Sequence, residues 1–184
     1  MGLAAPSGGL YCLDERGLTG PYVTGLVTGH GLGFSPDHRT LYLSDSHPSV
    51  KRIWAFDFDL ATGTLGHRRL FADMQNLPGR PDGAAVDDQG NYWSCGNDAG
   101  LIHVFSPAGQ HLRAVAVPVP KPSMCAFGGD GFASLYVTSI TPAARPTEPG
   151  DCSGAVVVLR AGACGLPEPL FSRFPVAGRD ALLT

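Results

Sequence analysis

The chain has 184 residues, of which 43% are hydrophobic and 16% are charged, and its formal net charge is −3 at pH 7. This length and composition predict one folded domain and exclude a disordered chain. Lysine and arginine together number 13, against 16 acidic residues. The charge therefore excludes a nucleic-acid partner held by a basic surface.

Glycine and proline are unusually frequent: the 25 glycines and 16 prolines make up about 22% of the 184 residues. In an ordinary chain the two together make up roughly 12%. Each costs about 1 to 3 kcal/mol inside a helix, so the composition predicts an all-β fold of short strands joined by turns. No apolar run reaches the roughly 18 residues that cross a membrane, and no membrane partner is expected. The five cysteines form no CxxC pair, which predicts free thiols in the cytoplasm.

The elements predicted in chain order fall into four loosely repeated units and a tail. The first unit, 1–29, has strands at 9–14 and 23–27. The second, 30–80, opens with the stretch Gly-Leu-Gly-Phe-Ser-Pro-Asp and continues with strands at 40–45, 52–57 and 69–71. The third, 81–121, opens with Pro-Asp-Gly-Ala-Ala-Val-Asp and continues with strands at 91–95, 101–105 and 111–117.

The fourth unit, 122–165, has strands at 124–127, 134–138 and 154–159, with a proline-rich loop at 141–151, and the tail is 166–184. Phe34, Val86 and Phe127 hold equivalent places and are spaced by 52 and 41 residues. Repeats of roughly 40 to 50 residues with four short strands each are typical of β-propeller blades.

The number of blades is small for a closed propeller. At about 45 residues per blade the chain supplies about four, and three are clear. An open array leaves strand edges unpaired. We therefore expect a single partial propeller domain over 1–184, either a fragment or a chain that self-associates through its open blade edges.

Three polar residues stand directly before the expected innermost strands at 31–35, 83–87 and 124–128: His30, Asp82 and Ser123. Innermost strands run along the propeller channel, so these side chains are expected to converge, and an imidazole with a carboxylate and a hydroxyl can hold a divalent metal. Each residue also has a structural interpretation as part of a turn or strand start. Asp45, at the end of a second strand, either faces the channel or caps a turn.

Several motifs in order resemble the gluconolactonase/regucalcin family, which includes senescence marker protein and luciferin-regenerating enzyme. They are the Gly-Leu-x-Phe-Ser-Pro-Asp stretch at 31–37, Leu-Tyr-Leu-Ser-Asp-Ser at 41–46, Pro-Asp-Gly-x-x-Val-Asp at 81–87, Pro-Ser-Met-Cys-Ala-Phe-Gly-Gly at 122–129 and Leu-Tyr-Val-Thr-Ser at 135–139. The resemblance covers residues 1 to about 165. It implies a six-bladed propeller with one divalent metal in the channel, which hydrolyses sugar lactones.

The resemblance also implies roles for individual residues. Asp82 falls on a family metal ligand that is also the expected general base, and His30 falls where the family has an asparagine ligand. That exchange shifts the expected metal from calcium toward zinc or another transition ion. Ser123 and Asp45 are weaker candidates for substrate contacts.

Other family residues have no counterpart here. The family's glutamate ligand and its substrate-contacting arginine and asparagine lie before Met1. The chain thus resembles the C-terminal three-fifths of a lactonase, and either a truncated enzyme or a non-functional remnant is consistent with it.

A non-catalytic binding module is the alternative. Residues 81–91 followed by 102–109 also resemble an NHL repeat, a propeller unit that binds partners. An NHL array repeats that pattern evenly, whereas 31–71 and 122–162 do not, so we favour the metal-dependent lactonase.

Overall fold

The computed structural model describes residues 5–14, 17–141 and 152–170. This part of the chain is all-β, with one short 3₁₀ turn, η1 (Asp130–Phe132), and no α-helix. Within it no helix is long and apolar enough to cross a membrane. The start of the chain at 1–4, most of the expected proline-rich loop (142–151) and the end of the tail (171–184) lie outside the described residues.

The strands form four antiparallel sheets that follow one another in chain order. The first sheet pairs β1 (Gly8–Asp14) with β2 (Gly17–Leu26). The second contains β3 (Gly29–Phe34), β4 (Thr40–Asp45), β5 (Arg52–Asp59) and β6 (Thr64–Asp73). The third contains β7 (Arg80–Val86), β8 (Tyr92–Asn97), β9 (Leu101–Phe105) and β10 (His111–Ala116), and the fourth contains β11 (Pro122–Gly128), β12 (Ser134–Ser139) and β13 (Val156–Arg160).

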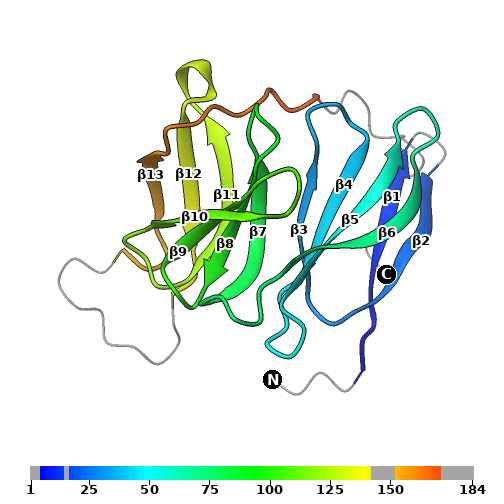
Figure 1. Ribbon diagram of the computed structural model, residues 1–184, viewed down its shortest axis with the longest axis horizontal. Helices are drawn as coiled ribbons and strands as arrows, with labels where there is room; N and C mark the ends of the chain where they lie inside the picture. Colours follow the sequence, from blue (N-terminus) through cyan, green and yellow to red (C-terminus); the bar gives the residue numbers. More distant parts are fainter. Residues whose placement is uncertain (1–4, 15–16, 142–151, 171–184) are drawn as a thin grey trace, which may run out of the picture.

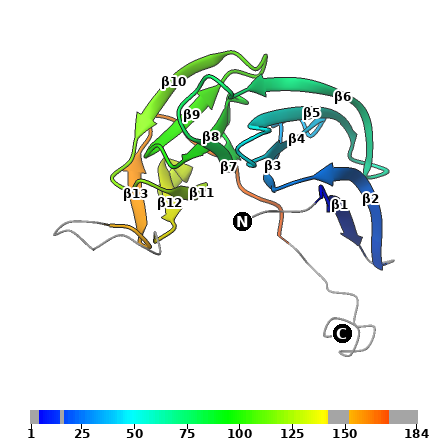
Figure 2. The ribbon, with the colours of Figure 1, turned by 90° about the horizontal axis from the view of Figure 1, so that it is seen from below.

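Within each complete sheet the strands form a meander, so every strand pairs with the one before it. Figure 1 shows the sheets standing side by side, and Figure 2 shows them arranged around an arc. In Figure 2 strands β3, β7 and β11 lie on the inner side of the arc, while β6 and β10 lie on its outer side. This arrangement confirms the all-β partial propeller.

The hydrophobic core lies between consecutive sheets and consists of three clusters. One joins the first two sheets around Leu43 and Phe56. The next joins the second and third sheets around Ile53 and Tyr92, and the last joins the third and fourth around Leu135. Strand β8 is buried along its whole length, because its two faces belong to two different clusters.

The two end sheets of the arc leave apolar side chains in solvent. On one face of the last sheet, Met124, Tyr136, Val156 and Val158 are 40 to 59% exposed. They share this face because the antiparallel register places Tyr136 opposite Val158. The first sheet exposes a comparable set, Tyr11, Leu13, Leu18 and Tyr22.

Candidate functional site

The imidazole of His30 and the carboxylate of Asp82 meet between two neighbouring sheets. His30 is the second residue of β3, and Asp82 is the third residue of β7. The Nε2 atom of His30 lies 3.1 Å from the Oδ1 atom of Asp82. The imidazole is 41% exposed and the carboxylate side chain 7%, so solvent reaches the pair from the histidine side.

Irregular strand pairing brings these two side chains together. The register of β3 against β4 shifts within 30–33, and that of β7 against β8 shifts within 81–84. A bulge of this kind bends the strand and redirects its side chains, as is common beside active sites. Glycine is required next to each side chain: Gly31 has φ of +61°, and a Cβ on Gly83 would collide with β11.

These bulges also correct one expectation. The site residues were expected directly before the innermost strands, but β3, β7 and β11 begin at Gly29, Arg80 and Pro122 and include them. The strands extend further because the residues ahead of each bulge still pair with the neighbouring strand; His30 is opposite Ser44, for example.

Burial dominates the electrostatics of Asp82. Desolvation raises the pKa of its carboxyl above the ordinary value, and His30, Ser46, Asn97 and Arg80 each offset part of that rise. The Ser46 hydroxyl is buried and does not complete a hydrogen bond of good geometry. A carboxylate whose pKa is raised in this way is better suited to accept a proton near neutral pH.

Sequence reasoning missed two residues near this carboxylate. Asn97 hydrogen-bonds to it, and Arg80 hydrogen-bonds to Asn97. The Asn97 Nδ2 donates to Oδ2 of Asp82 at 2.9 Å and to the Pro122 carbonyl at 3.1 Å. The Arg80 Nη2 donates to Oδ1 of Asn97 at 3.0 Å. The one available signal was Asn97 itself, an amide residue just after the end of a predicted strand.

The other two predicted residues form hydrogen bonds with groups outside this pair. The Ser123 hydroxyl is 2.8 Å from the Thr138 hydroxyl on β12. Asp45 is buried, and its carboxylate accepts backbone N–H groups from Val27, Thr28 and His47. Two of these bonds hold the connection between β2 and β3. They fit the interpretation of Asp45 as a residue that caps a turn.

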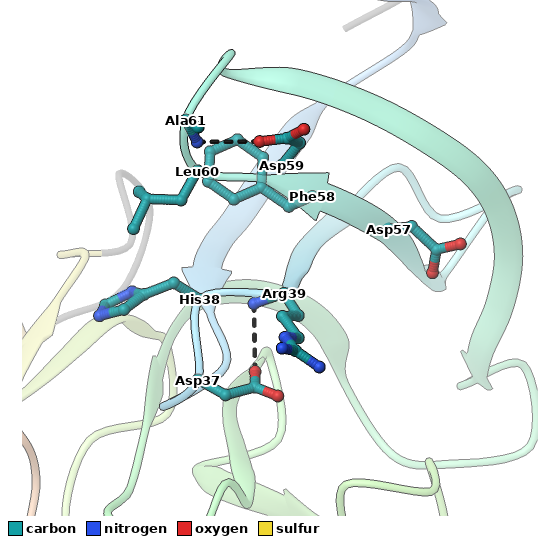
Figure 3. Close-up of a pocket in the computed structure, with 8 residues that line it drawn as sticks. All are labelled: Asp37, His38, Arg39, Asp57, Phe58, Asp59, Leu60 and Ala61. Atoms are coloured by element: carbon teal, nitrogen blue, oxygen red, sulfur yellow. Dashed lines mark hydrogen bonds between the residues drawn. The ribbon is translucent and has the colours of Figure 1, made fainter.

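An open pocket of about 590 Å³ lies at the other end of the same blade, beyond the end of β3. Figure 3 shows that its carboxylates are turned back to the backbone: Asp37 accepts from the Arg39 N–H at 3.1 Å and Asp59 from the Ala61 N–H at 2.9 Å. A third carboxylate, Asp57, pairs with Arg69. The acidic lining is therefore explained by two turn carboxylates and one ion pair between neighbouring strands.

The donor set around Asp82 fits a divalent metal in part. The distance of 3.1 Å between Nε2 and Oδ1 lies within the roughly 2.8 to 3.6 Å that separates two neighbouring ligands at octahedral or tetrahedral angles when each bond is about 2.0 to 2.2 Å. The buried Ser46 hydroxyl is a further oxygen near the carboxylate. The described residues contain no group of three or more His, Cys, Asp or Glu side chains placed for a metal, so other oxygen donors would complete the coordination.

Comparisons with known proteins show which family the chain belongs to. Residues 1–141 match the family model described as the SMP-30/Gluconolactonase/LRE-like region. The chain is 39% identical over 149 residues to a 6-deoxy-6-sulfogluconolactonase from Pseudomonas putida, covering 80% of this chain and 50% of the relative. It is 30% identical over 167 residues to a pentonolactonase from Haloferax volcanii, covering 88% and 57%.

Among solved structures, the calcium-binding protein regucalcin from Agrobacterium tumefaciens superposes with a TM-score of 0.85 at 24% identity, covering 92% of this chain and 57% of that one. That likeness shows the fold. The chain spans about half the length of the curated relatives it matches. Because the family model matches most of its residues, the chain belongs to the SMP-30/gluconolactonase/LRE-like family.

Proposed function

We propose that this chain carries part of the site of a metal-dependent sugar lactonase, with His30 and Asp82 as metal ligands. The observation that supports the proposal is the 3.1 Å approach of the imidazole to the buried carboxylate. Relatives named as lactonases support the class of reaction. They give no support to the NHL-type binding module over the lactonase.

In the proposed reaction a water oxygen bonds to the lactone carbonyl carbon, the ring C–O bond breaks, and a hydroxy acid leaves. A divalent metal bound here would polarise the carbonyl and lower the pKa of a bound water. Asp82 would take the proton from the attacking water as general base and return it to the ring oxygen as the ring C–O bond breaks.

The imidazole determines which metal is expected. Calcium prefers oxygen ligands, whereas zinc and other transition ions accept imidazole nitrogen readily. We therefore propose that the site binds zinc more tightly than calcium. Titration calorimetry with each ion tests this, and tighter binding of calcium would contradict the role of His30.

Hydrolysis of gluconolactone by the purified chain, with zinc, calcium or chelator, tests the proposed activity. We expect any turnover by the isolated chain to depend on the metal and to be abolished by Asp82→Asn. Asp57→Asn is the matched control, because Asp57 is an exposed carboxylate paired with Arg69 at the other end of the blade. Turnover that persists with chelator, or in Asp82→Asn, would overturn the proposal.

We also propose that copies of the chain self-associate through the apolar faces of the end sheets. Light scattering should give a mass above that of one chain, and Tyr136→Lys with Val158→Lys should lower it. Leu112→Lys, at an exposed leucine on β10, is the control and should leave the mass unchanged. A monodisperse monomer of the parent chain would contradict this proposal. The cytoplasmic location and the absence of nucleic-acid and membrane partners stay predictions.

A further inference from the structure

We propose that Arg80 is a positioning residue for Asp82, and that it acts through the side-chain amide of Asn97. The inference rests on the proposed function, in which Asp82 holds the metal. Arg80 was not among the predicted metal ligands. Within the described residues it hydrogen-bonds to Asn97, and Asn97 in turn hydrogen-bonds to the Asp82 carboxylate.

The Asn97 amide is held by three hydrogen bonds that all require the same orientation. Its Nδ2 donates to Oδ2 of Asp82 and to the Pro122 carbonyl, while its Oδ1 accepts from Nη2 of Arg80. If the amide were flipped, its oxygen would face the carboxylate and its nitrogen would face the guanidinium. Arg80 therefore opposes a rotation that would place two acceptors against each other.

The guanidinium of Arg80 is itself fixed in place. Its Nε lies 2.8 Å from Oδ2 of Asp98, and its Nη1 is 3.4 Å from the Ser46 carbonyl. Asp98 is in turn held by the ammonium group of Lys121 at 2.6 Å. Because the guanidinium is planar and engages partners on several of its nitrogens, its position leaves the Asn97 amide little freedom.

This arrangement decides how the carboxylate is presented. Oδ2 of Asp82 is occupied by the Asn97 amide at 2.9 Å, so only Oδ1 is turned toward His30. We infer that Asp82 binds the metal through Oδ1 alone. Residues that orient a metal ligand typically change metal affinity by about 10- to 100-fold when they are removed.

Calorimetric zinc titration of Arg80→Gln tests the inference, with Lys121→Gln as the matched control. Both variants remove one positive charge that pairs with Asp98, but only Arg80 contacts Asn97. Loss of a positive charge alone would strengthen cation binding. We expect Arg80→Gln to weaken zinc binding by about 10- to 100-fold and Lys121→Gln to leave it unweakened.

A double-mutant cycle with Asn97→Ala tests the route of the effect. If Arg80 acts through Asn97, then Arg80→Gln adds no further loss of affinity in the Asn97→Ala background. Additive losses would overturn the inference, and so would equal losses in Arg80→Gln and Lys121→Gln. The melting temperature of each metal-free variant separates a loss of affinity from a loss of fold.

A metal-free readout keeps the inference distinct from the proposed function. Solvent exchange of the Asn97 side-chain amide protons, followed by NMR, should be slow in the parent chain and in Lys121→Gln and faster in Arg80→Gln. If the parent binds no metal but exchange follows this order, the proposed function fails and the positioning contact stands. Equal exchange rates in all three proteins would overturn the positioning role.

Discussion

Tyr92→Phe removes one oxygen atom from the interface between the second and third sheets. The Tyr92 hydroxyl is fully buried and donates to the Gly31 carbonyl at 2.6 Å. The ring itself would remain packed against Tyr42 and Phe71, with centroids 5.2 and 5.8 Å away. The substitution therefore tests the hydrogen bonding of one hydroxyl group between two blades.

The expected cost follows from leaving a buried carbonyl without its donor. Such a loss amounts to about 1 to 3 kcal/mol, and we take about 2 kcal/mol. For a chain of 184 residues, each kcal/mol corresponds to roughly 2 to 4 °C in melting temperature. We therefore expect Tyr92→Phe to lower the melting temperature by about 4 to 8 °C.

Thermal unfolding followed by circular dichroism measures this change. Tyr136→Phe is the control, because Tyr136 is 40% exposed, and it should change stability by less than about 0.5 kcal/mol. If Tyr92→Phe melts within the range of that control, the bond makes no net contribution and the reasoning is refuted. Because Gly31 follows His30 in the chain, zinc titration of the same variant shows whether this bond also holds the imidazole.

Three further changes should alter stability in predictable ways. Asp87→Ala removes a buried acceptor of four hydrogen bonds, one of them from the Trp93 indole, and should cost about 3 to 5 kcal/mol in a urea titration; a cost below about 1 kcal/mol would contradict this. Leu135→Ala empties a fully buried core position and should cost about 2 to 5 kcal/mol, whereas Leu112→Ala, at an exposed leucine, should cost little. Burial lowers the pKa of His103. As the pH falls below about 6.5, the unfolded chain therefore binds the proton first and the stability of the folded chain falls. The melting temperature should depend less on pH between pH 7 and 5 in His103→Gln than in the parent chain, and an equal pH dependence in the two proteins would refute the assignment.

Much of the fold could be predicted because it depends on local patterns. Turn residues separate short alternating strands in every unit, and the repeat of such units indicates consecutive sheets. His30 and Asp82 could be paired for the same reason, since they occupy equivalent positions in successive units. Their approach to 3.1 Å follows from the repeat geometry, which brings equivalent inner strands side by side.

The rest of the site depends on pairing register, which the repeat does not specify. Arg80 and Asn97 meet because β7 and β8 place them opposite each other, although 16 residues separate them in the sequence. His103 and His111 are 8 residues apart in the sequence, and the hairpin of β9 and β10 brings their ring nitrogens to 3.1 Å. Asp45 could not be assigned between channel and turn until its three backbone partners were known.

The burial of β8 on both faces has a consequence for how the sequence can vary. An ordinary strand at a surface offers every second position to solvent, where substitutions are nearly free. None of the six positions of β8 is exposed, so each is constrained by packing on one side or the other. In a saturation library scored for folding, Tyr92–Asn97 should form a continuous intolerant block, while the largely exposed strand β10 (His111–Ala116) should accept most substitutions.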